Sequence, residues 1–216
     1  MANVDPLTPE QVPQLAEILA RSSAAMGFVP NSMLTMAHLP QLTAAFSMLA
    51  GVTFGADLQA LLPPAAVLQE SARGPAAPLP RALVQLVAFA CSVGAGCRYC
   101  QAHTSHGAHR LGEDQAKLDG ILGYESNDAY SEPERAALAL AFAAAAVPNE
   151  TTPAHFERLR EHFSEPEIVQ LVAVVALFGF LNRWNDTMAT QLEAAPLDFA
   201  EGALGGIGWD SGKHGG

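Results

Sequence analysis

The sequence is poor in charged residues, and basic residues are the scarcest. Only 15% of the 216 residues are charged, and 22 acidic residues outnumber 11 basic ones, giving a formal net charge of −11. Nucleic acids are bound through Lys and Arg that neutralise phosphates, and anionic membrane surfaces attract basic segments. The composition therefore argues against both partners. So few charges also predict an apolar surface hidden between subunits, and hence a homo-oligomer.

The sequence also lacks long apolar runs. Its longest apolar run, 168–181, is about 14 residues long, whereas a membrane span needs about 20; we expect a buried helix there. The start of the chain, MANVDPLTPE, has no basic region followed by an apolar one, so we expect no signal peptide. Three cysteines without an export signal do not suggest a disulfide framework. We therefore expect a cytoplasmic protein whose paired cysteines are redox-active or metal-binding.

Apolar residues at helical spacing dominate what is present. The β-branched residues lie inside alanine-rich helical periods, and no strand pattern of any length appears, so the predicted fold class is all-α. Two segments, Ser131-Glu-Pro-Glu134 and Ser164-Glu-Pro-Glu167, have the pattern of a capping box with proline in the first turn, and each predicts the start of a helix.

Changes in composition divide the chain into four segments. Residues 63–80 carry five prolines and form the strongest break. We expect an N-terminal helical layer over 1–62, a proline-rich connection over 63–80 and a helical core over 81–195. The last segment, 196–216, is rich in glycine and is predicted to be a loop-like tail.

Reactive side chains are concentrated between residues 79 and 112. An apolar helix ends at the Gly94-Ala-Gly96 break, and Cys97 then falls at or just before the first turn of a helix that should stop at Gly112. Unpaired N–H groups and the helix dipole favour a thiolate at such a position. Cys100 lies about 60° further around the helix axis, which is close enough for a disulfide with Cys97.

A histidine and an alternative reading accompany this pair. His103 can reach the Cys100 sulfur to exchange a proton. A structural zinc site is the competing hypothesis, because donors three residues apart continue through His106 and His109. Steps of three turn about 60° backwards on a helix, so at most three of these donors converge, and no second Cys-x-x-Cys completes the ligand set. We therefore predict no metal, and ordinary solvent-facing or interface roles for His106 and His109.

A third cysteine and a polar cluster lie within or beside apolar segments. Cys91 sits within the apolar helix and is predicted to be an inert, small hydrophobic residue. The polar cluster 182–186, Asn-Arg-Trp-Asn-Asp, follows the apolar run 168–181. We expect a satisfied polar network or a subunit contact there, with lining of the active site as the alternative.

A family resemblance adds to these inferences. The segment Gly-x-Gly-Cys97-Arg-Tyr-Cys100-Gln-Ala-His103-Thr, the apolar helix before it, the later LFGFLNRWND and the segment Gly27-Phe-Val-Pro-Asn31 resemble the carboxymuconolactone decarboxylase superfamily. Within it, they are similar to the uncharacterised, peroxidase-related members of the alkyl hydroperoxidase D-like branch. The resemblance covers roughly residues 24–192. It implies an all-α, alkyl hydroperoxidase D-like helical bundle that assembles as a trimer or hexamer.

The resemblance also implies a peroxidase cycle. Cys100 would attack the peroxide and become a sulfenic acid, and Cys97 would condense with it to a disulfide. A dithiol donor, such as a lipoyl protein, would reduce the disulfide, and no flavin, haem or metal would be required. A neighbouring thiol does trap a sulfenic acid before further oxidation.

At two positions the chain departs from the pattern of the branch. The glutamate of its proton relay, twelve residues before the first cysteine, is Gln85 here, and an amide is neither acid nor base. The usual histidine position, four residues after the second cysteine, holds Thr104, with His103 one place earlier. Two alternative functions stay open. One is a cofactor-free lyase or isomerase acting on a lactone or keto acid, and the other is a non-catalytic metal-binding or assembly protein.

Overall fold

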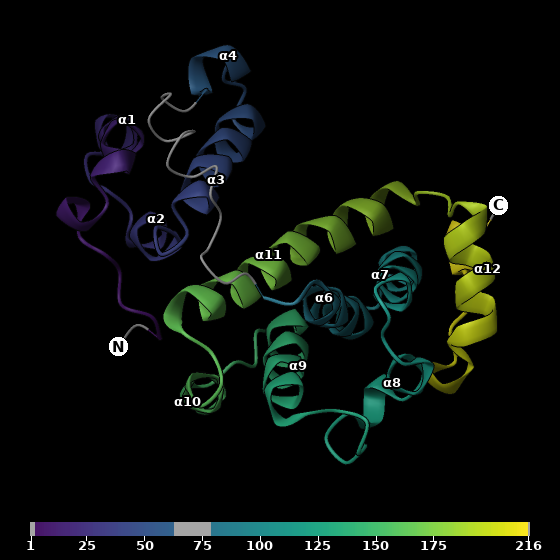
Figure 1. Cartoon of the computed structure of the whole chain (residues 1–216). Helices are drawn as coiled ribbons and strands as arrows, with labels where there is room; N and C mark the ends of the chain where they lie inside the picture. The colour runs from purple at the N-terminus through teal and green to yellow at the C-terminus, as the bar shows by residue number, and fades with distance from the viewer. Residues whose placement is uncertain (1–2, 63–78, 216) are drawn as a thin grey trace. The chain divides into compact units, whose positions relative to one another are not determined.

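A computed structural model describes residues 3–62 and 79–215 of the chain (Figure 1). Within these ranges all regular structure is helical, which confirms the predicted all-α class. The chain forms two compact units, one of residues 1–78 with 164–170 and the other of 79–163 with 171–216, and each is described by itself. Most of the predicted proline-rich connection, 63–80, lies outside the described residues.

The first unit is built from short helices. Its elements are two 3-10 turns, Pro9–Gln11 and Pro13–Leu15, and the helices α1 (Ala16–Met26), α2 (Asn31–Met36), α3 (Pro40–Thr53) and α4 (Leu58–Leu61). Leu15, Ile18 and Met33 are among the side chains that form its buried core. Helix α1 ends at Gly27, whose φ of +82° is a left-handed conformation that glycine adopts without strain.

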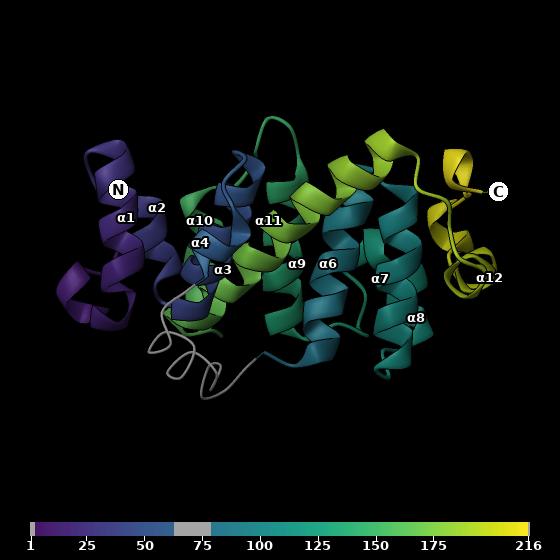
Figure 2. The ribbon, with the colours of Figure 1, turned by 90° about the horizontal axis from the view of Figure 1, so that it is seen from above.

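The second unit holds the cysteine-rich stretch. Its helices are α6 (Arg81–Ala95), α7 (Arg98–Arg110), α8 (Gln115–Asp119), α9 (Glu132–Ala145), α10 (Pro153–Arg160), most of α11 (Glu165–Met188) and α12 (Ala194–Ala203). Helix α6 packs against both α7 and α9, and α12 packs along α7 (Figure 1). Figure 2 shows α9, α6 and α7 side by side in this unit.

Helix α6 is buried because it lies between two neighbours. Leu86, Val87 and Phe89 are fully buried. Its neighbours come close at two glycine positions. A Cβ at Gly94 would lie 3.0 Å from the Cβ of Ala145 on α9, and a Cβ at Gly107 on α7 would lie 2.9 Å from Gln85 Oε1. Small residues thus allow close packing of the end of α6 on α9, and of the last turns of α7 on the first half of α6.

The predicted capping box at Ser131 is complete, and at Ser164 the carboxylate half of the predicted box is present. The Ser131 N–H donates to Glu134 Oε2 at 2.8 Å at the start of α9, and the Ser164 N–H donates to Glu167 Oε2 at 2.8 Å at the start of α11. Each pair satisfies backbone donors that have no partner inside the helix. Such caps typically contribute about 1 kcal/mol each to stability.

The predicted loop-like tail, 196–216, is partly wrong. Residues up to Ala203 belong to helix α12, and short 3-10 turns follow at Gly205–Ile207 and Gly212–His214. The glycines become frequent only after this helix, and Pro196 lies in its first turn, where a missing N–H does no harm. Packing against α7 supplies the stability that the composition of the tail does not suggest.

The apolar run 168–181 forms a helix, as predicted, but one of its sides is exposed. Within the described residues α11 is the one helix long and apolar enough, by length and composition, to cross a membrane. Its inner side contacts α6, where the Cys91 thiol points to the carbonyl oxygen of Val175. Its outer side exposes large apolar residues: Val172, Leu177, Phe180, Trp184 and Met188.

Candidate active site

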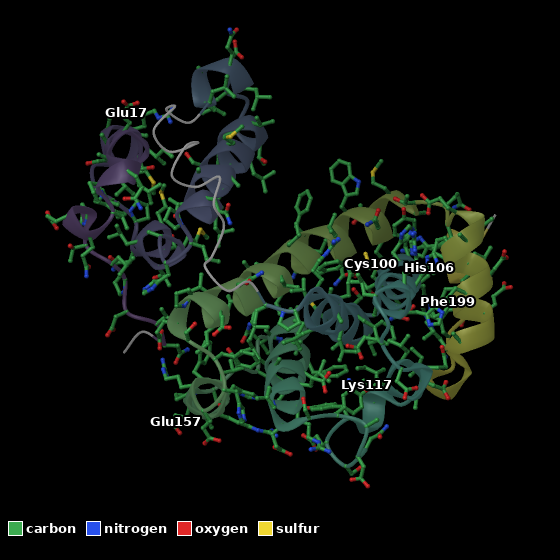
Figure 3. All side chains as sticks on the ribbon, viewed as in Figure 1. Glu17, Cys100, His106, Lys117, Glu157 and Phe199 are labelled. Carbon is green, nitrogen blue, oxygen red and sulfur yellow. The ribbon has the colours of Figure 1, made fainter. Side chains whose placement is uncertain are left out.

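The two cysteines lie where α6 passes into α7. Gly96, with φ of +76°, ends α6 in a left-handed conformation, and Cys97 becomes the N-cap of α7 with an extended backbone. Cys100 follows in the first turn; Figure 3 labels it on the ribbon. The side chains are 1% and 3% exposed, and the two thiols are hydrogen-bonded to each other. The structure therefore brings together the sulfurs that the Cys-x-x-Cys spacing predicts.

The environment of Cys97 favours its thiolate. The hydrogen bond from Cys100 lowers the pKa of the Cys97 thiol to about 7, against an opposing effect of burial. The charge of His214 lowers this pKa further, whereas Asp186 raises it. Cys97 also lies at the N-terminus of α7, where free N–H groups and the helix dipole favour negative charge.

The environment of Cys100 favours its neutral thiol. The hydrogen bond to Cys97 raises the pKa of the Cys100 thiol well above its usual range, and burial acts in the same direction. One group opposes this. The Asn185 amide donates to Cys100 Sγ at 3.5 Å and lowers the pKa. The pair is thus arranged as one thiolate with one thiol that donates to it.

His103, the predicted proton carrier, is held by a carboxylate. Its Nε2 lies 2.7 Å from Glu193 Oε2, and its ring lies 4.3 Å from that of Tyr99 between centroids. The Tyr99 hydroxyl donates to the same carboxylate at 3.2 Å. His103 is therefore one turn from Cys100 along α7, as predicted, with its imidazole engaged by Glu193 just before α12.

Gln85, the fourth predicted site residue, is not brought next to the sulfurs. Its amide lies against Gly107 of α7. Gly107 is seven residues beyond Cys100, which is about 10 Å along a helix axis. The structure therefore places Gln85 in the packing between α6 and α7, two turns away from the cysteine pair.

The remaining histidines of α7 pack under α12. The rings of His106 and His109 lie 5.4 and 4.9 Å from that of Phe199, between centroids. Figure 3 labels His106 on α7 and Phe199 on α12. Burial lowers the pKa of His106. These histidines do not converge with the cysteines, so the run of donors three residues apart does not form one metal site.

His214, which sequence reasoning missed, lies at the cysteine pair. A ring nitrogen of His214, a carboxylate oxygen of Asp186 and Cys97 Sγ all lie within 4.8 Å of one another. Lys213 Nζ pairs with Asp186 Oδ2 at 3.0 Å, so a cation of the chain itself neutralises this carboxylate. A histidine in a glycine-rich tail gives no signal in the sequence, because only the fold returns it to α7.

The polar cluster 182–186 also reaches the site. Asn185 contacts Cys100 and Asp186 approaches Cys97, as described above. This arrangement favours the alternative prediction for the cluster, that it lines the active site. Asn182, by contrast, points its amide to Cys91 Sγ at 4.0 Å. Cys91 is fully buried, and burial raises the pKa of its thiol to about 11, as expected for an inert cysteine.

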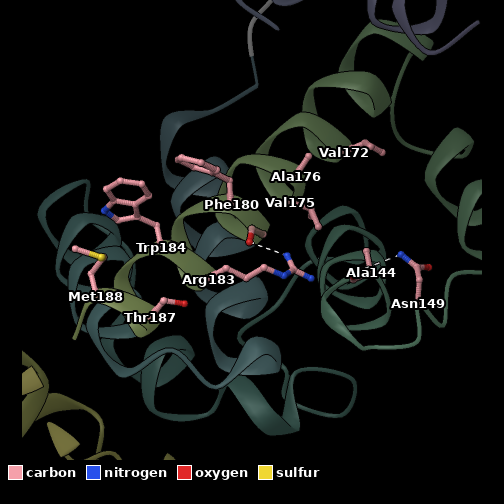
Figure 4. A pocket seen from close by; sticks show the side chains of 11 residues that line it. Ala144, Asn149, Val172, Val175, Ala176, Phe180, Arg183, Trp184, Thr187 and Met188 are labelled. Carbon is pink, nitrogen blue, oxygen red and sulfur yellow. Dashed lines mark hydrogen bonds between the residues drawn. The ribbon is translucent and has the colours of Figure 1, made fainter. Parts of the chain in front are cut away.

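A hollow of about 760 Å³ lies beside α11 in this unit (Figure 4). Its walls include Phe180, Trp184 and Met188, and the Arg183 side chain crosses it. A smaller cavity of about 250 Å³ shares Arg183 with it and extends to Cys91 and Asp186. The larger hollow thus offers space for a small, largely apolar molecule beside α11, and the smaller cavity is lined in part by the carboxylate that lies next to Cys97.

The fold and the site together define a class of protein. It is an all-α protein with two hydrogen-bonded thiols at the start of a helix. The model of the carboxymuconolactone decarboxylase family matches residues 65–143. The crystal structure of the debrominase Bmp8 is 33% identical, covers 94% of this chain and 97% of its own, and has a TM-score of 0.56. A variant of that debrominase in complex with 2,3,4-tribromopyrrole is 31% identical, with the same TM-score of 0.56, and covers 94% of this chain and 98% of its own.

The chain belongs to the carboxymuconolactone decarboxylase family, as the sequence motifs predict. A peroxidase-related protein of Silicibacter sp. TM1040, uncharacterised, is 18% identical over 89% of this chain and 90% of its own, with a TM-score of 0.51, and shows the shared fold. The uncharacterised protein YdfG of Bacillus subtilis (strain 168) is 33% identical over 92 residues. That match spans 42% of this chain and 60% of the length of the relative.

Proposed function

We propose that this protein is a thiol-dependent oxidoreductase in which Cys97 attacks the substrate and Cys100 resolves the product. The observation that carries the proposal is the position of Cys97 at the N-terminus of α7, with a ring nitrogen of His214 within 4.8 Å of its sulfur. The pKa of the Cys97 thiol is lowered and that of Cys100 is raised, in the same sense. The thiolate is the nucleophile in such chemistry. The resemblance implies the reverse order of roles, with Cys100 attacking, but the hydrogen bond between the thiols and the helix N-terminus both favour charge on Cys97.

With a peroxide the cycle balances as follows. The Cys97 thiolate attacks the O–O bond of ROOH, which gives Cys97–SOH and an alkoxide that takes up a proton to become ROH. The Cys100 thiol then condenses with the sulfenic acid, forming the disulfide and releasing water. A dithiol donor returns both cysteines to thiols and is itself oxidised to a disulfide. The sum is ROOH plus a dithiol giving ROH, water and a disulfide.

A second candidate uses the same thiols on a different acceptor. The similarity to the debrominase over nearly the whole chain supports reductive removal of a halogen from an aromatic ring. There, Cys97 would take the bromine as a sulfenyl bromide, and the ring would gain a proton. Cys100 would then form the disulfide and release HBr. The aromatic walls and the Arg183 guanidinium of the hollow beside α11 suit a planar, electron-rich or acidic ring.

One pair of assays tests the proposal and separates the two candidates. Reduced protein is mixed with cumene hydroperoxide or with a bromopyrrole in the presence of a small dithiol, and loss of each substrate is followed. We expect turnover of at least one substrate, and loss of that turnover in Cys97→Ser. Cys100→Ser should complete one attack and then stop at a sulfenic acid or a mixed disulfide. Full peroxide turnover in Cys97→Ser would overturn the assignment of the roles.

The lyase alternative predicts a different result in the same variants. The family includes a decarboxylase, and a lactone or keto acid would need no thiol for reaction. Activity on such a substrate that persists after both cysteines become serine would select this alternative. Under our proposal, the double variant has no activity on an oxidising substrate.

The homo-oligomer stays part of the proposal. Phe180, Trp184 and Met188 on α11 are 46%, 55% and 62% exposed, a face that a second subunit would cover. We expect a trimer or hexamer, and light scattering coupled to size-exclusion chromatography tests this. The dithiol donor, such as a lipoyl protein, and the cytoplasmic location are likewise predictions.

A further inference from the structure

The C-terminal segment places an imidazole at Cys97. His214 is 1% exposed, and its backbone carbonyl accepts a hydrogen bond from the Leu192 N–H at 2.8 Å. The segment before it is tied to α7 as well. The Trp209 indole donates to the carbonyl oxygen of Arg98 at 3.2 Å, and the Arg98 guanidinium pairs with Asp210 at 3.4 Å. Figure 1 shows the C-terminus returning beside the end of α11. His214 is therefore held in place from several directions.

The hydrogen bonds of His214 fix which nitrogen faces the site. Nδ1 lies 2.8 Å from the carbonyl oxygen of Thr190. A carbonyl oxygen only accepts, so Nδ1 donates, and the neutral ring then carries its lone pair on Nε2. Nε2 is buried without a hydrogen-bond partner. It lies 3.6 Å from Asp186 Oδ1, and a ring nitrogen of His214 lies within 4.8 Å of Cys97 Sγ.

Groups that can carry charge face this ring from two helices and from its own segment. Cys97 and Tyr99 face it from α7, the latter with a ring-centroid distance of 5.9 Å, and Asp186 faces it from α11. Lys213, next to it in the chain, opposes the extra positive charge but is paired with Asp186. Transfer of the Cys97 proton to Nε2 would place an imidazolium between the Cys97 thiolate and the Asp186 carboxylate. The opposite charges stabilise the thiolate and the imidazolium.

We propose that His214 is the acid–base group of the cysteine pair: its Nε2 takes the proton of the Cys97 thiol and later gives it to the departing oxygen or ring carbon of the substrate. Only the second half of this inference, the donation of the proton to the substrate, rests on the proposed function. The first half, the proton transfer between Cys97 and His214, requires no substrate. The effect of His214 on the pKa of Cys97 is in the same direction.

The test follows the alkylation of Cys97 in the full-length, reduced protein. Iodoacetamide is added between pH 5 and 10, and mass spectrometry of the Cys97 peptide gives its rate at each pH. His214→Asn keeps a donor where Nδ1 lies and so preserves the bond to Thr190, but it has no Nε2. We expect the midpoint of the rate curve to rise by about one pH unit in this variant. His109→Asn, which changes a histidine packed on Phe199, is the matched control and should leave the curve in place.

Turnover and rescue give a second readout. If the proposed function holds, oxidant turnover at pH 7 should fall about a hundredfold in His214→Asn, the size of effect expected for a general acid–base group. In His214→Ala, added imidazole should restore part of the alkylation rate, because the lost ring leaves space for it. A merely structural role of His214 would not allow this rescue.

The outcomes separate the inference from the proposed function. An unchanged midpoint in His214→Asn, or a rise of the midpoint in His103→Asn alone, would overturn the role of His214. A wild-type protein that turns over no oxidant, but whose midpoint still depends on His214, would overturn the function and keep the proton transfer. If the His214 variants do not fold, NMR titration of His214 in Cys97→Ser decides: its midpoint should fall relative to wild type, and no change would contradict the proposal.

Discussion

Cys91 and Cys97 are six residues apart and almost equally buried, yet their chemistry differs. Cys91 is 0% exposed and Cys97 is 1% exposed. The pKa of the Cys91 thiol is raised to about 11, and that of Cys97 is lowered to about 7. Cys91 lies mid-helix, where backbone N–H groups are already used, and its main neighbour is a carbonyl oxygen of α11. Cys97 lies at a helix N-terminus with a thiol, an imidazole and free N–H groups around it.

The comparison shows that burial does not decide whether a cysteine reacts. Desolvation disfavours the thiolate at both sites, because both pKa values include an upward contribution from burial. At Cys97 the hydrogen bond from Cys100 and the charge of His214 outweigh it. At Cys91 only the charge of Arg183 opposes burial, and burial prevails. Donors and charges around the sulfur therefore set its reactivity.

The largest effect should come from removing one cysteine or the other. Cys97→Ser should lower oxidant turnover about a thousandfold or more, because the attacking group is lost. Cys91→Ala should change it less than twofold, because this thiol stays neutral and its hydrogen bond goes to the carbonyl oxygen of Val175 rather than to the pair. Steady-state turnover with a small dithiol measures both. Equal losses in the two variants would show that the difference between the cysteines has no functional meaning.

Alkylation rates at pH 7 should differ by about a hundredfold. At this pH about half of Cys97 and about one in ten thousand of Cys91 would be thiolate, given pKa values of about 7 and about 11. The lower intrinsic nucleophilicity of the more acidic thiol offsets part of this ratio. Because thiolate forms as pH rises, the Cys97 rate should climb through pH 7 and then level off. The Cys91 rate should still be rising at pH 10. Peptide mapping after timed additions of iodoacetamide measures both rates.

The smallest effect on the rate of disulfide formation should come from replacing one of two asparagines that contact the cysteines. Asn185 donates to the sulfur of Cys100, and Asn182 points to that of Cys91. Asn185→Ala should slow disulfide formation about fivefold, since one hydrogen bond of about 1 kcal/mol stabilises Cys100 when it ionises to attack. Asn182→Ala should leave that rate unchanged and cost about 1 kcal/mol of stability. Stopped-flow oxidation and thermal unfolding of both variants test this contrast. The opposite ranking would contradict the proposed role of Asn185.

The sequence predicts the local structure of the site but not its long-range contacts. The all-α class, the ends of α6 and α7, and the two capping boxes follow from residues adjacent in sequence, such as Gly96 and Ser131. Helical spacing predicts that His103 lies near Cys100, yet Glu193, 90 residues later, determines the orientation of its ring. The family resemblance predicts Gln85 at the site, but the packing of α6 against Gly107 places it elsewhere.

The missing half of the site comes from distant segments. Asp186 and His214 approach Cys97 only because α11 and the C-terminal segment return to the start of α7. The hydrophobic periodicity of the sequence does not indicate such a contact. The glycine-rich composition of the tail predicts a loop without function. The helix α12 was missed for the same reason, since its stability comes from packing on α7 rather than from its own residues.

Mapping the disulfide after mild oxidation tests the central claim most directly. Reduced protein is treated with one equivalent of hydrogen peroxide, the remaining thiols are alkylated, and the peptides are analysed by mass spectrometry. The predicted result is one intramolecular disulfide joining Cys97 and Cys100 in each chain, with Cys91 recovered as a free thiol. A disulfide that includes Cys91, a cross-link between chains, or three intact thiols would contradict the account.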